Sequence, residues 1–191
     1  TDAERLLREE LSADGHLVYA WCVMANHYHV VVRSSAVTLA RTFGRVQASF
    51  GRWRNRALGS MGPTWQSRYR AKLVADERYL TQLIAYVHLN PVEAGAVSDP
   101  ATYPLSGHRE VLGAGGPGLV ARDAVLAIYG DSERDALTAY MASLSATHDE
   151  GAEWVRTLPG DLPWWRRQAD RPIHPPELVA WVDTEGRPGR E

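Results

Sequence analysis

Two histidines stand one residue apart in a stretch that otherwise has the pattern of a buried strand. Residues 27–33 read HYHVVVR, and residues 16–24 before them, HLVYAWCVM, are equally rich in β-branched and aromatic side chains. Only two residues separate these stretches, so the pattern predicts an antiparallel hairpin. Alternate side chains of a strand share a face. We therefore expect His27 and His29 on one face, with Tyr28 and the valines that alternate with it turned into a core.

The two histidines are candidate metal ligands. Residues two apart in a strand lie about 7 Å apart at the backbone, so both imidazoles can reach one ion. The chain holds 7 histidines, however, and a His-x-His pattern also arises by chance. A metal site needs at least one further donor from elsewhere in the sequence.

That donor is sought in residues 76–90, which have the pattern of a helix capped by Asp76 and ended by Pro91. Tyr86 and Asn90 are four residues apart and share a helix face. The amide oxygen of Asn90 is a candidate third metal ligand. The phenol of Tyr86 is a candidate nucleophile, because a divalent ion that polarises a phosphate assists attack on it. The alternative is that Tyr86 is a half-buried core aromatic and Asn90 only the last residue of the helix.

Charge is distributed very unevenly along the chain. No acidic residue occurs between Asp14 and Asp76, although that stretch holds nine lysines and arginines. The net charge is therefore +9 in this stretch and −11 elsewhere, which gives the overall −2. Such a segment favours a polyanionic ligand, most often a nucleic acid. A solvated basic face without a partner is the alternative.

Within the basic stretch, residues 37–58 predict a helix capped by Thr38, and residues 65–74 predict a strand that alternates basic and apolar side chains. The helix has a core-facing side made of Leu39, Phe43, Val46, Phe50 and Trp53. The expected phosphate contacts are Arg41, Arg45, Arg52, Arg56, Arg68, Arg70 and Lys72. Trp65 and Tyr69 interleave with these charges and are candidates for stacking on unpaired bases. Core packing is the alternative for both aromatic residues.

The rest of the chain suggests a catalytic part followed by an extension. Residues 2–11 predict a short amphipathic helix behind Asp2, and residues 132–144 predict another. We expect a domain over 1–112, a linker and helical extension over 113–150, and a partly disordered tail rich in proline and tryptophan over 151–191. The single cysteine, short apolar runs and absence of a signal-peptide pattern predict a cytoplasmic protein that does not enter a membrane.

Three blocks of the sequence together resemble a known family. They read YAWCVMANHYHVVV, SRYRAKLVADERYLTQLIAYVHLNPVEAGAV and YPLSGHREVLG. In this order and spacing, over about the first 130 residues, they are similar to the REP-associated tyrosine transposases. These belong to the single-tyrosine branch of the HUH nucleases, whose motif is two histidines around one hydrophobic residue. By this resemblance, His27 and His29 match the metal ligands, Tyr86 the nucleophile and Asn90 the third ligand.

The resemblance implies an α+β, ferredoxin-like antiparallel sheet with packed helices. It also implies Mg²⁺- or Mn²⁺-dependent cleavage of single-stranded DNA near a hairpin. Tyr86 would form a 5′-phosphotyrosine and leave a free 3′-OH, which can reseal or transfer the strand. The partner is then single-stranded or hairpin DNA, and the protein is expected to be a monomer or a homodimer.

Two departures from the family pattern lead to further expectations. Alanine stands at position 25, where the family has proline, and this change affects turn rigidity. The family also begins with a strand ahead of the first helix, whereas this sequence opens inside that helix. The strand beside His27 and His29 is therefore expected to be missing, unless another segment takes its place.

Two other functions remain open on the sequence. One is a catalytically decayed nucleic-acid-binding module that keeps the basic surface. The other is a different His-x-His metalloenzyme, such as a hydrolase of a small phosphate ester, because this donor set also suits Zn²⁺. A covalent protein–DNA adduct distinguishes the transposase-like enzyme from both.

Overall fold

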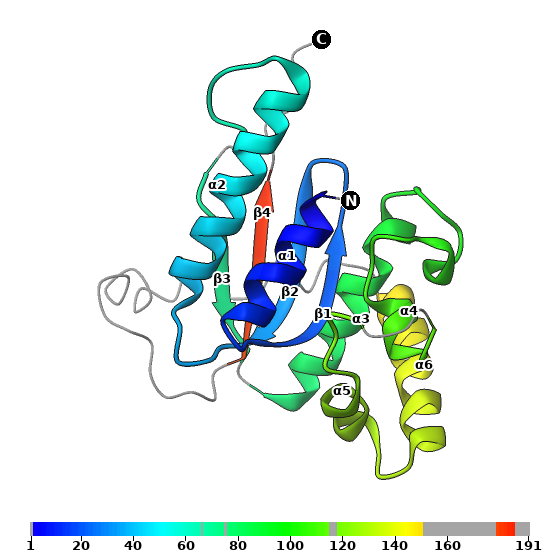
Figure 1. The fold of residues 1–191 in the computed structure, drawn as a ribbon. Coiled ribbons are helices and arrows are strands. Elements are labelled where there is room, and N and C mark those ends of the chain that lie inside the picture. The colour runs from blue at the N-terminus through cyan, green and yellow to red at the C-terminus, as the bar shows by residue number, and fades with distance from the viewer. Residues whose placement is uncertain (1, 66, 75, 115–117, 151–178, 186–191) are drawn as a thin grey trace.

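The fold is α+β, with helices packed on both faces of one antiparallel sheet (Figure 1). The computed structural model describes residues 2–65, 67–74, 76–114, 118–150 and 179–185. In chain order, its elements are α1 (Asp2–Ala13), β1 (Leu17–Val23), β2 (His27–Arg33), α2 (Leu39–Leu58), β3 (Arg70–Leu73), α3 (Glu77–Glu93), the 3₁₀ turn η1 (Pro100–Thr102), α4 (His108–Val111), α5 (Arg122–Tyr129), α6 (Glu133–Glu150) and β4 (Val179–Glu185).

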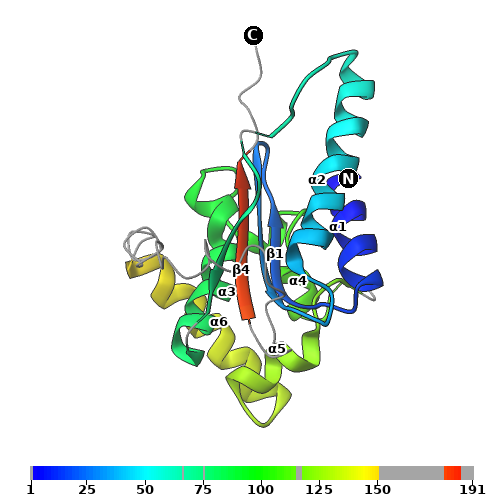
Figure 2. The same ribbon diagram turned by 90° about the vertical axis from the view of Figure 1, so that its left-hand side faces the viewer.

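The sheet has the strand order β1-β2-β4-β3, and every neighbouring pair is antiparallel. Its last strand in sequence is thus an inner strand, between the predicted hairpin and β3 (Figure 2). In β4, Val182 is fully buried and pairs with Val30 of β2 on one side and Ala71 of β3 on the other. The sequence assigned this segment to the tail, whereas here it holds the two halves of the sheet together.

The predicted hairpin of β1 and β2 is confirmed. Val23 pairs with Tyr28 and Cys22 with His29, and the Met24 N–H closes the turn on the His27 carbonyl at 2.8 Å. Six of the seven residues of β1 and five of the seven of β2 are buried. This continuous burial reflects helices on both faces of the sheet, in contrast to a sheet with one solvated face.

The two faces carry different helices. α1 and α2 cover one face, and α3 covers the other with α6 behind it (Figures 1 and 2). Tyr28 faces α2, where its ring stacks on that of Phe43 at 6.1 Å between centroids. His29 faces α3, where its ring meets that of Tyr86 at 5.7 Å. The expected division of β2 into a core face and a histidine face is therefore confirmed, but α3 covers the histidine face.

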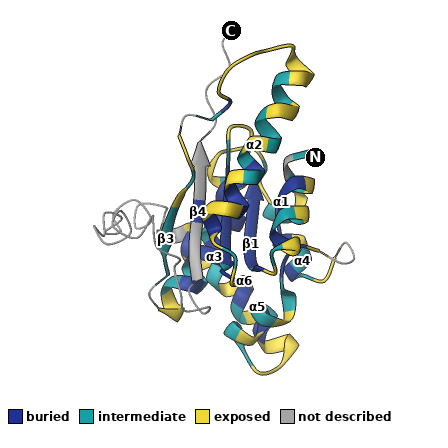
Figure 3. Ribbon diagram, turned by 60° about the vertical axis from the view of Figure 1, so that its left-hand side comes forward, coloured by how far each residue is buried: buried dark blue, intermediate teal, exposed yellow. Residues whose placement is uncertain are grey.

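The helix predicted over 37–58 is confirmed as α2, and its outer half leaves the core. The Thr38 hydroxyl caps its start by accepting from the Arg41 N–H, as expected. Phe43 and Val46 are fully buried, whereas Trp53 is 39% exposed. The end of α2 extends past the end of the sheet (Figures 1 and 2), and the exposed colour increases along it (Figure 3). The prediction that this face of the helix packs in the core is thus wrong for the last turns.

The helix predicted to stop at Asn90 continues through Pro91 as α3. Proline has no N–H to donate to the carbonyl four residues earlier, so one helical hydrogen bond is missing at this point, and α3 extends only two residues beyond it, to Glu93. The helix ends at Glu93 and is followed by Gly95, whose φ is 68°, and the Ala96 N–H bonds the Pro91 carbonyl at 2.8 Å. The Gly95 N–H bonds the Val92 carbonyl, which completes a Schellman motif. Glycine at the left-handed position, and not proline, therefore sets the end of the helix.

The expected extension is largely helical. The helix predicted over 132–144 is confirmed within α6, which buries Tyr140 and Leu144 against the rest of the protein. α5 precedes it and was not predicted. The disorder expected over 151–191 falls outside the described residues, apart from the strand β4 (Val179–Glu185).

Candidate active site

The predicted metal ligands of β2 lie side by side on the α3 face of the sheet. The ring centroids of His27 and His29 are 4.8 Å apart, with the rings inclined by 70°. His27 is half-buried, whereas His29 is only 6% exposed. The pair therefore has one buried member and one that reaches the protein surface.

α3 brings the other two predicted residues to the same place. Asn90 hydrogen-bonds the side chain of His29, and its amide nitrogen donates to the Tyr86 carbonyl one turn earlier, at 2.9 Å. The half-buried Tyr86 ring packs edge-on against His29. The structure thus brings together His27, His29, Tyr86 and Asn90, which the sequence selected from two separate elements.

The environment keeps His29 neutral. Burial lowers the pKa of His29 to about 3, and the neighbouring His27 lowers it further, while the hydrogen bond to Asn90 opposes both. A neutral imidazole is the form that binds a metal, so protons do not compete for His29 near neutral pH.

Asn26 orients the more exposed histidine. Its side-chain oxygen lies 2.7 Å from Nδ1 of His27, which fixes Nδ1 as the protonated nitrogen and leaves Nε2 as the acceptor. Such an outer hydrogen bond to one ring nitrogen is typical of histidines that bind metals through the other. The sequence analysis counted Asn26 only as one of the two residues between the predicted strands, although its place directly before His27 was the available signal.

The donor set of the site fits a divalent ion. Two imidazoles and an amide oxygen are nitrogen and oxygen ligands that Mn²⁺ accepts, and Mg²⁺ favours the oxygen donors among them. No group of three or more histidine, cysteine, aspartate or glutamate side chains suited to a metal occurs among the described residues. The candidate ligands are therefore His27, His29 and Asn90.

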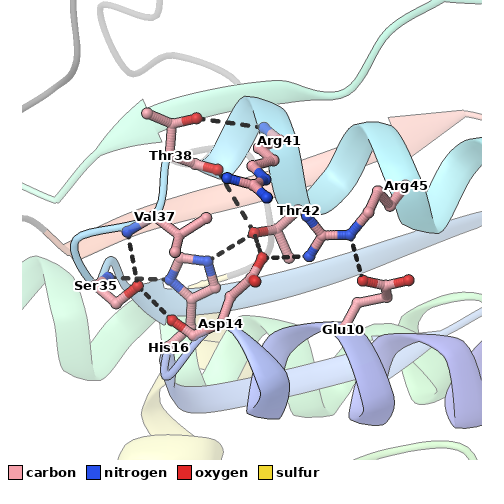
Figure 4. A network of polar contacts seen from close by, with 9 residues as sticks. All are labelled: Glu10, Asp14, His16, Ser35, Val37, Thr38, Arg41, Thr42 and Arg45. Atoms are coloured by element: carbon pink, nitrogen blue, oxygen red, sulfur yellow. Dashed lines mark hydrogen bonds and ion pairs between the residues drawn. The ribbon is translucent and has the colours of Figure 1, made fainter.

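The predicted phosphate-binding arginines fall into two groups. Arg45 pairs with Glu10 at 2.6 Å and with Asp14 at 2.5 Å, so its charge is balanced inside the protein (Figure 4). The other predicted arginines are exposed, and their guanidinium groups form no ion pair with any side chain that the structure describes; they are Arg41, Arg52, Arg56, Arg68 and Arg70. Arg54, on the outer half of α2, is likewise without an ion pair there.

The carboxylate that holds Arg45 belongs to a closed polar network (Figure 4). The Ser35 N–H donates to Nδ1 of His16, so His16 carries its proton on Nε2 and donates it to the Thr42 hydroxyl at 2.8 Å. That hydroxyl in turn donates to Asp14. The hydrogen bonds from Thr42 and Arg45 outweigh the effect of burial and lower the pKa of Asp14. The network joins α1, the loop between α1 and β1, the loop after β2, and α2, so the charge of Arg45 is balanced without a bound ligand.

The two predicted stacking residues pack within the protein. Trp65 is half-buried, donates its indole N–H to the Gln47 carbonyl at 3.0 Å, and lies 5.2 Å from the ring of Phe50. Tyr69 packs against Phe43 at 5.3 Å, and burial raises the pKa of its phenol. These contacts are the core packing that the sequence left open as an alternative.

The register of the sheet places the basic strand on the histidine face. Within the sheet, His29 pairs with Asp183 of β4, and Asp183 pairs with Arg70 of β3. Directly paired residues of an antiparallel sheet share a face. Arg70 therefore lies on the same face as His29, two strands or about 10 Å away. Lys72, two residues along β3, shares that face and is half-buried.

A second histidine cluster lies on the other side of α3. The Tyr140 hydroxyl of α6 is 2.8 Å from Nδ1 of His88 and 2.6 Å from Nδ1 of His108, and all three residues are buried. Burial lowers the pKa of both histidines and raises that of Tyr140. The cluster ties α3 to the helical extension and has no exposed member.

Comparisons of the sequence with protein-family models and with curated proteins, and of the structure with solved structures, give no match. No helix among the described residues is long and apolar enough to cross a lipid bilayer.

Proposed function

We propose that this protein is a metal-dependent nuclease and strand transferase that acts on single-stranded or hairpin DNA through a phosphotyrosine intermediate. The observation that carries the proposal is the convergence of His27, His29, Tyr86 and Asn90 at one end of the sheet. A phenol beside two imidazoles and an amide oxygen combines a nucleophile with the donors of a divalent-metal site.

The strand order supports the ferredoxin-like part of the proposal. In a βαββαβ sheet, the first and third strands are the inner ones, and all neighbours are antiparallel. The order β1-β2-β4-β3 has the same pattern, with β4 in the position of the first strand beside β2. The strand that we expected to be missing from the sequence therefore has a substitute in the C-terminal segment, and β2 is paired on both edges.

In the proposed reaction, Tyr86 attacks the phosphorus of the scissile phosphodiester. A bond forms between its phenolic oxygen and phosphorus, the bond from phosphorus to the 3′-oxygen breaks, and the proton lost by the phenol is balanced by protonation of the leaving 3′-oxygen. A divalent cation held by His27, His29 and Asn90 would polarise the phosphate and stabilise the charge that develops on its oxygens. The phosphotyrosine conserves the energy of the diester, so a 3′-OH can attack it to rejoin or transfer the strand.

The chain positions these groups in three ways. The adjacent turns of α3 hold Tyr86 and Asn90 on one face, toward His29. Asn26 fixes the orientation of His27. Arg70 lies on the same sheet face as His29 and forms no ion pair with the side chains that the structure describes, so its charge is suited to bind the DNA backbone near the reacting phosphate. We place this reaction in the cytoplasm, because a lone buried cysteine, Cys22, fits a reducing compartment.

The proposal is tested by a denaturing-gel assay for a covalent protein–DNA adduct, using a pool of labelled hairpin oligonucleotides and Mn²⁺. Wild type is expected to form an adduct, and Tyr86→Phe to form none while binding the DNA with nearly unchanged affinity. Tyr79→Phe is the matched control, because it removes a phenolic hydroxyl about two turns earlier on the same helix, α3. An adduct that persists in Tyr86→Phe would contradict the proposal. DNA binding without an adduct in wild type would favour the decayed binding module.

A further inference from the structure

The outer half of α2 combines two features that the catalytic site does not use. Three of the four large hydrophobic side chains that are exposed in the described residues lie here or just beyond: Trp53 at 39%, Leu58 at 63% and Met61 at 99%. The same helical turns carry Arg52, Arg54 and Arg56, none of which forms an ion pair within the described chain. Exposed apolar surface with concentrated, unbalanced positive charge marks a binding surface.

The exposed tryptophan packs on one side against a row of other aromatic rings. Its ring lies 5.4 Å from that of Phe50, which lies 5.2 Å from Trp65, which in turn lies 5.7 Å from Tyr28 of the core. Trp53 is thus the outermost of four aromatic rings that run from the sheet to the surface. An exposed aromatic ring with a fixed orientation is suited to stacking, because little side-chain entropy is lost on binding.

The position of this helix end relates it to the catalytic residues. It projects from the same end of the sheet as the turn between β1 and β2, which precedes His27 (Figures 1 and 2). The chain returns from it toward β3 through the exposed Arg68. A strand of DNA that leaves the histidine face at this end therefore meets positive charge on its way to α2.

We propose that the outer half of α2 binds single-stranded DNA, with an unpaired base stacked on Trp53 and the flanking phosphates bound by Arg52, Arg54 and Arg56. Stacking on an aromatic side chain together with arginine contacts to the backbone is how proteins bind unpaired strands without reading their sequence. The charge favours DNA over an apolar protein partner, since the segment from residue 15 to residue 75 contains no acid. The inference rests on the proposed function for the identity of the polyanion.

The test measures binding without chemistry, by fluorescence anisotropy of a labelled short oligothymidylate in EDTA. Trp53→Ala is expected to weaken binding about tenfold, and Trp53→Phe to retain most of the affinity. Met141→Ala, which removes an equally exposed hydrophobic side chain from α6, is the matched control and should bind as wild type. Replacing Arg52, Arg54 and Arg56 together by glutamine should reduce the slope of log affinity against log salt by about 2, as expected for three phosphate contacts on a single strand.

Stacking is separated from a structural effect by a double-mutant cycle. Oligonucleotides with abasic positions should bind wild type more weakly, but should bind Trp53→Ala no worse than the intact oligonucleotide does. Additive losses, or unchanged binding by Trp53→Ala, would overturn the inference. It would also be overturned if Trp53→Ala left DNA binding intact and instead abolished self-association in sedimentation velocity or binding to anionic vesicles. Because no cleavage is measured, absence of a covalent adduct would refute the nuclease while leaving this result standing.

Discussion

α3 separates two clusters that each combine a pair of histidines with a tyrosine. On the side of α3 that faces α6, His88, His108 and Tyr140 are all buried, and the Tyr140 hydroxyl hydrogen-bonds both imidazoles. On the sheet side, His29 is buried, but His27 and Tyr86 reach the surface. Residue types alone do not distinguish the clusters. A closed cluster fastens helices together, whereas a cluster that substrate and metal can reach is able to carry out chemistry.

The difference follows from spacing along the chain. His27 and His29 lie on one strand, so the pleat directs them to one face whatever else the protein does. His88 and His108 come from separate helices and meet only because those helices pack. The first pair is therefore recognisable in the sequence, and the second becomes visible only in the structure.

The largest expected effect comes from His29→Ala, which removes the buried ligand of the open cluster. Metal-dependent adduct formation should fall about 10³-fold, because the proposed metal site would lose one of its three candidate protein ligands. Isothermal titration with Mn²⁺ should show the matching loss of affinity, independent of DNA. His148→Ala, at an exposed histidine paired with Glu93, is the control. Unchanged Mn²⁺ affinity in His29→Ala would show that the cluster is not a metal site.

The second prediction concerns the closed cluster. Tyr140→Phe leaves two buried imidazole nitrogens without their partner, and should lower the free energy of unfolding by about 3 kcal/mol. Urea denaturation measures the loss, and adduct formation below the unfolding transition should stay as in wild type. Tyr86→Phe should show the reverse pattern, with nearly full stability and no adduct. If Tyr140→Phe abolished the adduct in the folded protein, the division between the clusters would fail.

The network around Asp14 is a second closed cluster and should respond like the first. Asp14→Asn weakens charged hydrogen bonds and is expected to cost about 2 kcal/mol at pH 7. Because the folded-state pKa of Asp14 is lowered, its contribution is complete above the unfolded-state pKa near 4 and is lost as the pH falls through the folded value. Denaturation curves of both proteins should therefore converge in acid. If the two proteins still differed in free energy of unfolding at pH 2, the loss in Asp14→Asn would come from altered packing and not from the charge of Asp14.

The smallest effect is expected at the edge of the open cluster. Asn26→Ala removes the hydrogen bond that orients His27, and should weaken Mn²⁺ binding about tenfold, or by ~1.4 kcal/mol. Asn26→Asp keeps an acceptor at this position and should bind at least as well as wild type. Equal loss in both variants would show that the turn, and not the hydrogen bond, supports His27.

Local sequence rules predicted the elements that form the site, and failed where packing over long distances decides. The hairpin and the caps Thr38 and Asp76 follow from short patterns, and so do the positions of Tyr86 and Asn90 on one helix face. The fourth strand could not be assigned, because β4 pairs with segments about 110 and 150 residues earlier and has no local signal for that partner. Trp53 was placed in the core because helical periodicity does not indicate where the sheet beneath the helix ends.

The most direct test of the central claim is to locate the covalent bond in the protein–DNA adduct. After nuclease trimming and trypsin digestion, the peptide that follows Arg78 carries three tyrosines, Tyr79, Tyr86 and Tyr103. Fragmentation by tandem mass spectrometry distinguishes them by the mass of the attached nucleotide. The account predicts the nucleotide on Tyr86 alone. Attachment to Tyr79, Tyr103 or any other residue would contradict it.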